Sequence, residues 1–332
     1  MRHLIGITMG CPSGIGPEII LKFFSTLAAD TEFQPIVLGD LGVLRRASSE
    51  IRLPAILTAW RPGDTVVPGT VPVCNLTSLD SGSVQWGKPN AATGRAMALY
   101  IEEAVRLIKK GILAAVVTCP ITKQGLNMAG CLYPGHTEML AALTGTDQYL
   151  MMMAGARLRV ILVTIHEPLR RVAEMITTDK IGQCIAMTAK ALSSDFGLEK
   201  SRIAVAGLNP HSSEQGMFGR EEQEIIAPAI AAAKKGCDVS GPWPPDTVFY
   251  HAAAGRFDAV IAMYHDQGLI PFKLLHFADG VNVTLGLPIV RTSVDHGTAY
   301  DIAGRGIAES SSLEAAFSMA GLIVGNRMKR DF

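Results

Sequence analysis

The chain has 332 residues, of which 48% are hydrophobic and 18% are charged. At about 150 residues per domain this length predicts roughly two domains, and the hydrophobic content excludes an intrinsically disordered chain. Lysine plus arginine and aspartate plus glutamate both number 30, so the chain lacks the basic excess that is typical of proteins that bind nucleic acid or anionic membranes.

Targeting and membrane signals are not expected in this sequence. Residues 1–10 hold one arginine and a short apolar stretch, which is too short for a signal peptide. No run of about 18 apolar residues occurs, so we expect no membrane-spanning helix. The six cysteines are scattered without a CxxC pair, a usage typical of reduced, mostly buried thiols. We therefore expect a cytoplasmic protein.

In the first part of the chain, short apolar runs alternate with longer amphipathic stretches. This alternation predicts an α/β fold with a largely parallel sheet. Pro17 suits the first turn of a helix, because its missing N–H costs nothing there, and Gly111 suits a helix end. The expected elements are strands at 4–9, 36–39 and 112–118 and helices at 17–28 and 91–110.

Further along the chain, three largely apolar runs predict buried strands of a parallel sheet. They lie at 158–165, 202–207 and 257–264, with helices expected at about 180–196 and 220–235. Gly197 and Gly236 are natural caps for the carboxyl ends of these two helices.

Each of these three strands is followed by a histidine, namely His166, His211 and His265. Ligands of open α/β sheets bind at the carboxyl ends of the strands, so the three imidazoles are expected to converge. Three histidines with one open position are typical of a catalytic divalent metal, and nitrogen ligands favour Zn²⁺ or Co²⁺ over Mg²⁺. The spacing is long-range, and a histidine after a strand is also typical of a cap or a satisfied core group, so this alternative stays open.

A polar turn containing His136 and Thr137 precedes an apolar helix expected at 139–143. The N-terminus of that helix would favour an anion. The alternative is that Thr137 is an ordinary helix cap.

Three polar side chains, Lys273, Asn282 and Arg291, lie in strongly apolar surroundings. A cation in such a segment needs a partner. A bound phosphate or carboxylate would supply one, and a structural salt bridge is the alternative.

Two glycine-containing loops are candidates for nucleotide binding. Gly14 and Gly16 open a helix after the first strand, but the full GxGxxG pattern is absent, and a tight strand-to-helix turn is the alternative. Residues 295–304 form a second polar loop, which by itself indicates only a turn.

Seven longer motifs are spread along the chain: ITMGCPSGIGPEI (7–19), YPGHTEML (133–140), HEPLRRV (166–172), GLNPHSSEQGMFGREE (207–222), PPDTVF (244–249), AMYHDQGLIPFK (262–273) and GVNVTLGLPIVRTSVDHGTAYDIAGRG (280–306). Taken together, these motifs resemble the 4-hydroxythreonine-4-phosphate dehydrogenase family over nearly the whole chain. Cys11 stands where many members carry Asp or Glu, a departure that does not touch the metal or phosphate positions.

The resemblance implies a fold of two α/β/α domains that flank a cleft, like that of isocitrate and isopropylmalate dehydrogenases. We expect a discontinuous cofactor-side domain, 1–130 plus 270–332, and a second domain, 131–269, with most metal and substrate ligands. The family also implies a homodimer whose active site is shared between the two subunits.

The resemblance also assigns roles to particular residues. It implies one divalent metal ion (Zn, Co or Mg) at His166, His211 and His265, and substrate contacts from His136, Thr137, Lys273, Asn282 and Arg291. His296, Gly297 and Asp301 resemble the adenosine-binding loop of related dehydrogenases, which implies NAD as cofactor, with NADP as the alternative. Asp246 and Asp266 flank the proposed site in sequence and are candidates for the general acid or base, or for groups that orient a histidine.

The implied activity is NAD-dependent oxidative decarboxylation of 4-phosphohydroxy-L-threonine to 3-amino-2-oxopropyl phosphate, in pyridoxal 5'-phosphate biosynthesis. One alternative is a dehydrogenase for D-threonate or D-erythronate 4-phosphate in sugar-acid catabolism. Others are a phosphotransacetylase-like acyl transferase and a non-catalytic sensor of phosphorylated ligands on the same scaffold. The quoted motifs do not separate the first alternative from the biosynthetic enzyme.

Overall fold

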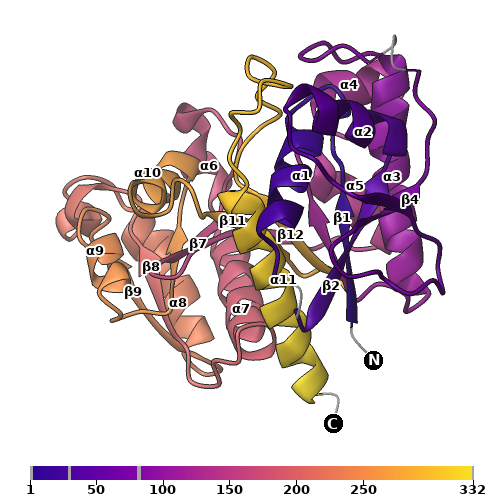
Figure 1. Cartoon of the computed structure of the whole chain (residues 1–332). Helices are drawn as coiled ribbons and strands as arrows, with labels where there is room; N and C mark the ends of the chain where they lie inside the picture. Colours follow the sequence, from indigo (N-terminus) through magenta and orange to yellow (C-terminus); the bar gives the residue numbers. More distant parts are fainter. Residues whose placement is uncertain (1–2, 29–30, 81–83, 331–332) are drawn as a thin grey trace. The chain divides into compact units, whose positions relative to one another are not determined.

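A computed structural model describes residues 3–28, 31–80 and 84–330 of the chain and confirms the α/β fold (Figure 1). The chain forms two compact units, each made of two segments. Unit 1 is Met1–Gln148 with Leu287–Val324, and unit 2 is Tyr149–Gly286 with Gly325–Phe332. Within the described residues, no helix has both the length and the apolar character needed to cross a membrane.

Unit 1 contains six parallel strands in the order β3-β4-β2-β1-β5-β12. They are β1 (His3–Thr8), β2 (Phe33–Gly39), β3 (Leu57–Ala59), β4 (Val71–Asn75), β5 (Ala115–Thr118) and β12 (Val290–Val294). The helices are α1 (Gly16–Thr26), α2 (Leu41–Glu50), α3 (Ala91–Lys109), α4 (Lys123–Met128), α5 (His136–Thr144) and α11 (Ser311–Arg330), whose last turns belong to unit 2.

The expected elements of unit 1 are present with small shifts at their ends. Helix α3 begins at Ala91 because Asn90 caps it: the Asn90 side chain accepts hydrogen bonds from the backbone of Ala92 and Thr93, and the Thr93 hydroxyl accepts one from the Asn90 backbone N–H. This reciprocal pair satisfies N–H groups that a helix start leaves without partners. Helix α3 packs against β1, β2 and β5 and also contacts α4 and α5.

Unit 2 has the strand order β11-β6-β7-β10-β8-β9, in which β6 is antiparallel to both of its neighbours. The strands are β6 (Leu150–Ala154), β7 (Arg159–Leu162), β8 (Arg202–Ala206), β9 (Asp238–Trp243), β10 (Ala259–Ala262) and β11 (Val281–Leu285). The helical segments are η1 (Leu169–Arg171), α6 (Val172–Met175), α7 (Thr178–Ser194), η2 (Pro210–Glu214), the π-helix η3 (Glu222–Ile226), α8 (Ala227–Ala233), α9 (Val248–Ala253) and α10 (His265–Leu275).

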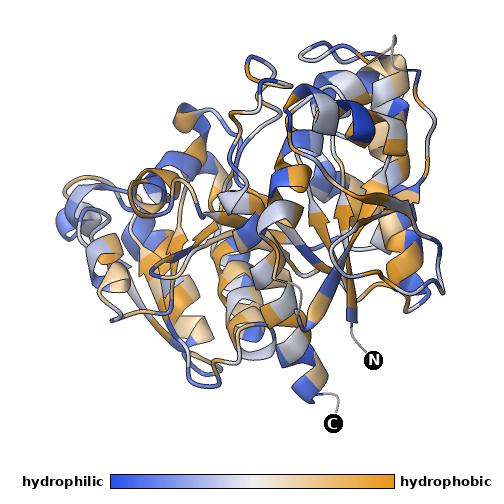
Figure 2. Cartoon of the chain, in the orientation of Figure 1, coloured by the Kyte–Doolittle hydropathy of each residue, from blue (hydrophilic) through white to orange (hydrophobic). Residues whose placement is uncertain are grey.

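The core of unit 2 follows from the alternation of side chains along its strands. Val260 and Ala262 of β10 lie in one apolar cluster with Phe249 of α9 and Phe272 of α10. Helices α7 and α8 pack against each other, and they contact the sheet at β10 and β9, respectively. Figure 2 shows that strands of both units are strongly hydrophobic, as expected for strands covered on both faces.

The two compact units divide at 148/149 and 286/287, whereas the family resemblance implies domain boundaries at 130/131 and 269/270. Helix α5 falls in unit 1 because it packs on α3, where Lys109 Nζ donates to the Leu143 carbonyl. Helix α10 falls in unit 2 because it packs on β7 and β10. The end of α11 joins unit 2 through Arg327, which forms an ion pair with the buried Asp195 at 2.8 Å.

We predict that Gly155→Ala destabilises the fold, because an added Cβ would lie 2.4 Å from the His276 ring. That ring is buried and cannot turn away freely, since its Nε2 accepts from Arg157 N and its Nδ1 lies 3.1 Å from Asp279 Oδ1. Overpacking of this kind costs about 1–3 kcal/mol of unfolding free energy. The matched control is Gly182→Ala in α7, where a Cβ meets nothing within 4 Å.

Urea unfolding of the two variants beside the wild type measures both effects. Gly182→Ala should be stabilised by about 0.5–1 kcal/mol, because alanine loses less backbone entropy in a helix than glycine. A Gly155→Ala protein as stable as the wild type would contradict the close packing of His276.

Candidate functional site

The three strands that precede His166, His211 and His265 are neighbours in the sheet of unit 2. β10 lies between β7 and β8 and is parallel to both, with Ala262 opposite Leu162 and Ile261 opposite Val205. Their carboxyl ends therefore lie at one edge of the sheet, where ligands of α/β proteins bind.

His166 and His265 lie side by side at this edge, with ring centroids 5.8 Å apart. His265 is the first residue of α10, and its Nδ1 lies 2.7 Å from Oδ1 of Asp266. A carboxylate that accepts from Nδ1 fixes the tautomer and leaves Nε2 available to a metal ion. The Asp266 carboxylate lies where an orienting group for His265 would lie, and the roles of His166, His265 and Asp266 stay predictions.

His211 is held differently, on a turn whose backbone is left-handed. Residues 211–215 all have positive φ angles, with 52° at His211 and 60° at Gln215. Non-glycine residues rarely adopt this conformation, and such strain is concentrated at functional sites. The sequence does not predict this turn, because none of its five residues is glycine.

Within residues 3–28, 31–80 and 84–330, no three His, Cys, Asp or Glu side chains gather closely enough to hold one metal ion. Two of the three predicted ligands are therefore adjacent in this chain, and His211 does not join them in a three-ligand group. The three-histidine metal site stays a prediction.

In unit 1, the polar turn before α5 and the strand β12 place His136 and Arg291 close together. Arg291 is buried, and its Nη2 and Nε donate to the Thr118 hydroxyl at 2.9 and 3.2 Å. Burial lowers the pKa of Arg291 to about 10, an effect that the nearby Glu138 carboxylate opposes. Arg291 is therefore a cation at neutral pH, and it lies where a buried anion would be stabilised.

His136 is neutral in this setting. Burial, and then the positive charge of Arg291, hold its pKa well below the ordinary value. Its Nε2 atom is fully buried and has no hydrogen-bond partner within the described part of the chain. A buried polar atom without a partner is costly unless a ligand supplies one.

Thr137 does not cap helix α5. The helix begins at His136 rather than at residue 139, and the residue before it, Gly135, makes no side-chain capping bond. Gly135 adopts an extended backbone that places Thr137 inside the first turn. The N–H groups of a first helical turn attract anions, so Thr137 lies where the anion-binding interpretation requires it.

The remaining predicted substrate and acid–base residues are spread over unit 2. Lys273 lies in α10 with Nζ 5.5 Å from the Phe277 ring centroid, and Asn282 is half-buried in β11 opposite Met153. Asp246 is exposed in the connection between β9 and α9. Asp266 contacts His265 directly, which favours its role as an orienting group over that of a proton carrier.

The predicted cofactor loop follows β12 in unit 1. It is docked on the first loop of the chain, where Ile15 N donates to the Thr298 carbonyl and the Tyr300 hydroxyl donates to Cys11 Sγ. His296, Gly297 and Asp301 are exposed on this loop. A Cβ added at Gly297 would meet no atom within 4 Å, which leaves open space for a ligand.

Two residues near Arg291 were not predicted from the sequence, namely Thr118, which accepts from its guanidinium, and Glu138, whose charge it faces. Glu138 lies beside His136 and Thr137 in the same motif, so a search for acidic partners of a buried arginine could have found it. Thr118 ends a strand and carries no such signal.

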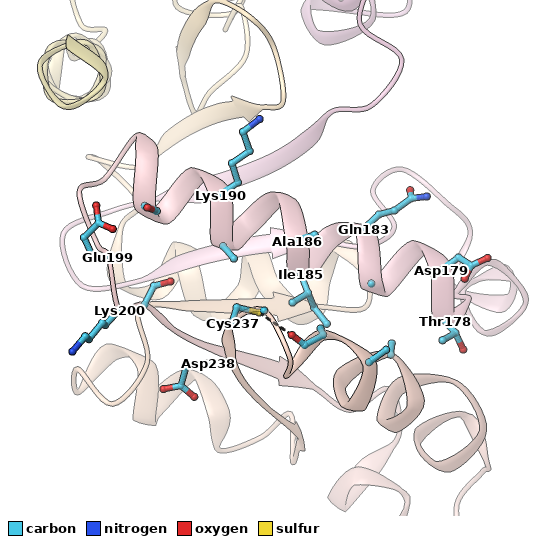
Figure 3. A pocket seen from close by; sticks show the side chains of 18 residues that line it. Thr178, Asp179, Gln183, Ile185, Ala186, Lys190, Glu199, Lys200, Cys237 and Asp238 are labelled. Carbon is cyan, nitrogen blue, oxygen red and sulfur yellow. Dashed lines mark hydrogen bonds between the residues drawn. The ribbon is translucent and has the colours of Figure 1, made fainter. Parts of the chain in front are cut away.

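A cavity of about 1040 Å³ lies elsewhere in unit 2, between α7 and α8. Figure 3 shows its lining, with Gln183 and Lys190 of α7 and the half-buried Cys237. None of the residues that line it is a predicted site residue. Its lining combines small residues, five alanines and two glycines, with charged and polar side chains such as Asp179, Glu199 and Lys200.

Comparison with known proteins identifies the family. The family model "Pyridoxal phosphate biosynthetic protein PdxA" matches residues 31–320. The chain belongs to this family. This membership confirms the resemblance drawn from the sequence and establishes the chain as an oxidoreductase of the PdxA dehydrogenase family.

Individual relatives support the assignment. A 4-hydroxythreonine-4-phosphate dehydrogenase of Desulfosudis oleivorans is 53% identical over 323 residues, which cover 96% of this chain and 95% of the relative. The crystal structure of a 4-hydroxythreonine-4-phosphate dehydrogenase from Klebsiella pneumoniae has a TM-score of 0.90 and 42% identity, and the match covers 98% of each chain. A protein of Oceanobacillus iheyensis with the provisional name D-threonate 4-phosphate dehydrogenase is 41% identical and covers 96% of this chain and 97% of its own.

The lowered pKa of His136 predicts a pH-dependent stability. The unfolded chain takes up a proton near pH 6.5, whereas the folded chain does so only at lower pH. The free energy of unfolding should therefore fall as the pH decreases through 6.5, by at most about 1.4 kcal/mol per pH unit from this residue.

Urea unfolding of the wild type and of His136→Gln between pH 7.5 and 5.5 measures this effect. The variant should lose less stability than the wild type over this range, because glutamine does not titrate. Equal pH dependence in the two proteins would contradict a His136 that stays neutral in the folded chain.

Proposed function

We propose that the protein catalyses the NAD-dependent oxidative decarboxylation of 4-phosphohydroxy-L-threonine to 3-amino-2-oxopropyl phosphate, a step of pyridoxal 5'-phosphate biosynthesis. The proposal is carried by the adjacent His166 and His265 at the carboxyl edge of β7 and β10, in a chain of this dehydrogenase family. Relatives that carry the name of this dehydrogenase match along almost their full length.

The donor set fits a divalent ion. Two imidazoles whose ring centroids are 5.8 Å apart are at the separation expected of two ligands of one ion, since Zn–N bonds are about 2.0–2.1 Å long. The Asp266 carboxylate at His265 Nδ1 is the usual outer partner of a ligating histidine. His166, His265 and His211 would hold the ion, which as a Lewis acid would stabilise negative charge that develops on the substrate's C3 oxygen.

The reaction requires two bond changes in sequence. Bound NAD would supply the acceptor for a hydride from C3. The protein's own groups would take the proton of the C3 hydroxyl, and this oxidation gives a ketone β to the C1 carboxylate. The bond between C1 and C2 then breaks, carbon dioxide leaves, and C2 takes up a proton. Asp246 is the candidate proton carrier, because it is exposed, whereas Asp266 is engaged by its contact with His265 Nδ1.

The anionic ends of the substrate need fixed partners if the C3 hydrogen is to be oriented toward the cofactor. Arg291 supplies a buried positive charge, and the neutral His136 supplies an Nε2 that lacks a partner. Thr137 adds the hydroxyl and backbone of the first turn of α5. We assign this group to an anionic end of the substrate, and Lys273 and Asn282 to further substrate contacts.

The cofactor is expected at the loop that follows β12, with NAD as the proposed acceptor and NADP as the alternative. His296, Gly297 and Asp301 are exposed on this loop, and the free space beside Gly297 allows a nucleotide to approach the backbone. The anchoring of the loop through Thr298 and Tyr300 supports a preformed binding surface.

We further propose that the enzyme is a cytoplasmic homodimer and that the partner subunit contributes to each active site. The resemblance to this family supports the proposal, because it implies an active site shared between two subunits. The mass in solution should be twice the 35.4 kDa of the chain.

One alternative substrate is favoured by a specific finding. The Oceanobacillus iheyensis relative with the provisional name D-threonate 4-phosphate dehydrogenase is nearly as long as this chain and 41% identical to it. D-Threonate 4-phosphate has the same carboxylate, C3 hydroxyl and phosphate and lacks the amine. The residues assigned above do not distinguish the two substrates.

Formation of NADH by the purified protein tests the proposed function. With Co²⁺, Zn²⁺ or Mg²⁺ present, 4-phosphohydroxy-L-threonine should be oxidised faster than D-threonate 4-phosphate or D-erythronate 4-phosphate. A preference for either sugar acid would keep the chemistry and change the substrate. No NADH from any of the three would contradict the proposed function.

His166→Ala should abolish both metal binding and NADH formation and leave the fold intact, because the residue is exposed and carries no packing role. His251→Ala on α9 is the matched control, since this histidine lies outside the predicted site. Full activity of metal-free His166→Ala protein would refute the proposed role of the ion.

A further inference from the structure

The backbone of Met263, just beyond the end of β10, is hydrogen-bonded on both sides. Its carbonyl accepts from the Thr164 amide at 3.2 Å and from the Thr164 hydroxyl at 2.8 Å. Its N–H donates to the Gln267 side-chain oxygen at 2.7 Å. All three residues are buried, so these bonds are shielded from water.

The side chain of Gln267 continues this chain of hydrogen bonds to β8. Its Nε2 donates to the carbonyl of Gly207 at 2.8 Å. Gly207 directly follows β8 and begins the loop that carries His211. One amide side chain therefore connects the end of the His265 strand to the start of the His211 loop.

The next residues of that loop are held by a second buried side chain. Glu222 of the π-helix η3 accepts from the backbone N–H groups of Leu208 and Asn209 at 2.8 and 2.7 Å. It also accepts from the Asn209 side-chain amide at 3.0 Å. The loop is thus fixed up to Pro210, immediately before the left-handed turn at His211.

We propose that Gln267 is a positioning residue for the predicted metal ligands: together with Thr164 it fixes the ends of β7, β10 and β8, the strands that precede His166, His265 and His211. The inference rests on the proposed function, because it assumes that these histidines bind the ion. Thr164 makes the tie from β7 to β10, and Gln267 makes the tie from β10 to β8. Neither residue has to touch the ion or the substrate for this role.

The chemistry of the position explains why an amide is present. The side chain must accept from the Met263 N–H and donate to the Gly207 carbonyl at the same time. Glutamine does both, whereas a glutamate carboxylate only accepts and would face the Gly207 carbonyl with a second oxygen. Gln267→Glu therefore keeps size and shape and removes one of the two ties.

The experiment is a titration of metal-free enzyme with Co²⁺, in competition with a chromogenic chelator, for the wild type and Gln267→Glu. Loss of a group that hydrogen-bonds a metal ligand directly typically weakens metal binding by about 10- to 100-fold. Gln267 acts one step further out, through the backbone of Met263 and Gly207, so we expect Co²⁺ binding by Gln267→Glu to weaken by up to about tenfold. Thr164→Val, which loses the hydroxyl tie, should also bind Co²⁺ more weakly, and Thr164→Ser should recover the wild-type affinity.

The control for general destabilisation is Asp195→Asn, which also exchanges a carboxylate and an amide at a buried site of unit 2. Asp195 pairs with Arg327 at the carboxyl end of α7, and it contacts none of the three histidine-bearing segments. It should lower the melting temperature and leave the Co²⁺ affinity unchanged.

The outcomes separate this inference from the proposed function. Wild-type enzyme that binds Co²⁺ no better than Gln267→Glu, with both proteins folded by circular dichroism, would overturn the positioning role and leave the proposed function standing. Wild-type enzyme that binds no Co²⁺ at all would overturn both. If Gln267→Glu fails to fold, the comparison is made between Thr164→Val and Thr164→Ser. Equal Co²⁺ affinity of these two variants would overturn the inference.

Discussion

The parallel pairing of β10 with β7 on one side and with β8 on the other is the constraint on which the candidate metal site depends. Parallel strands end at the same edge of a sheet, so residues that follow them are brought together whatever their distance in sequence. His166 and His265 are almost 100 residues apart in the chain and become neighbours for this reason. The hydrogen bonds around Met263 extend the pairing beyond the strands, toward the loops that carry the histidines.

The second functional group depends on burial rather than on strand pairing. Arg291 is a charged side chain inside unit 1, and its charge affects its neighbours strongly because little water screens it. Burial, and then the charge of Arg291, keep His136 neutral, so its Nε2 can interact with a ligand. A phosphate or carboxylate would gain both a cation and a polar partner here, which explains why so polar a group is tolerated in an apolar region.

Much of the fold follows from the sequence, because apolar runs of strand length and helical periodicity are local signals. The strands β1, β5, β7, β8 and β10 and the helices α1, α3 and α7 lie where these signals place them, within a few residues. The antiparallel strand β6 and its partner β11 were not predicted, since their pairing joins segments more than 120 residues apart. Long-range pairing of this kind leaves no local pattern.

The candidate site was also predictable only in the parts that have a local signal in the sequence. The strand ends identify His166 and His265, and the motif identifies His136 and Arg291. The left-handed turn at His211 contains no glycine or asparagine, the residues that usually indicate such a turn in a sequence. Gln267 is a single amide in an apolar run, and its hydrogen-bond partners are backbone atoms. Both features are set by tertiary contacts, which only the structure reveals.

A crystal structure of the protein grown with Co²⁺ would test the central claim most directly, because anomalous scattering locates this ion without ambiguity. The account predicts a single strong peak within about 2.0–2.2 Å of nitrogen atoms of both His166 and His265, at the carboxyl edge of β7 and β10. A Co²⁺ peak bound elsewhere, with these two histidines free of metal, would contradict it.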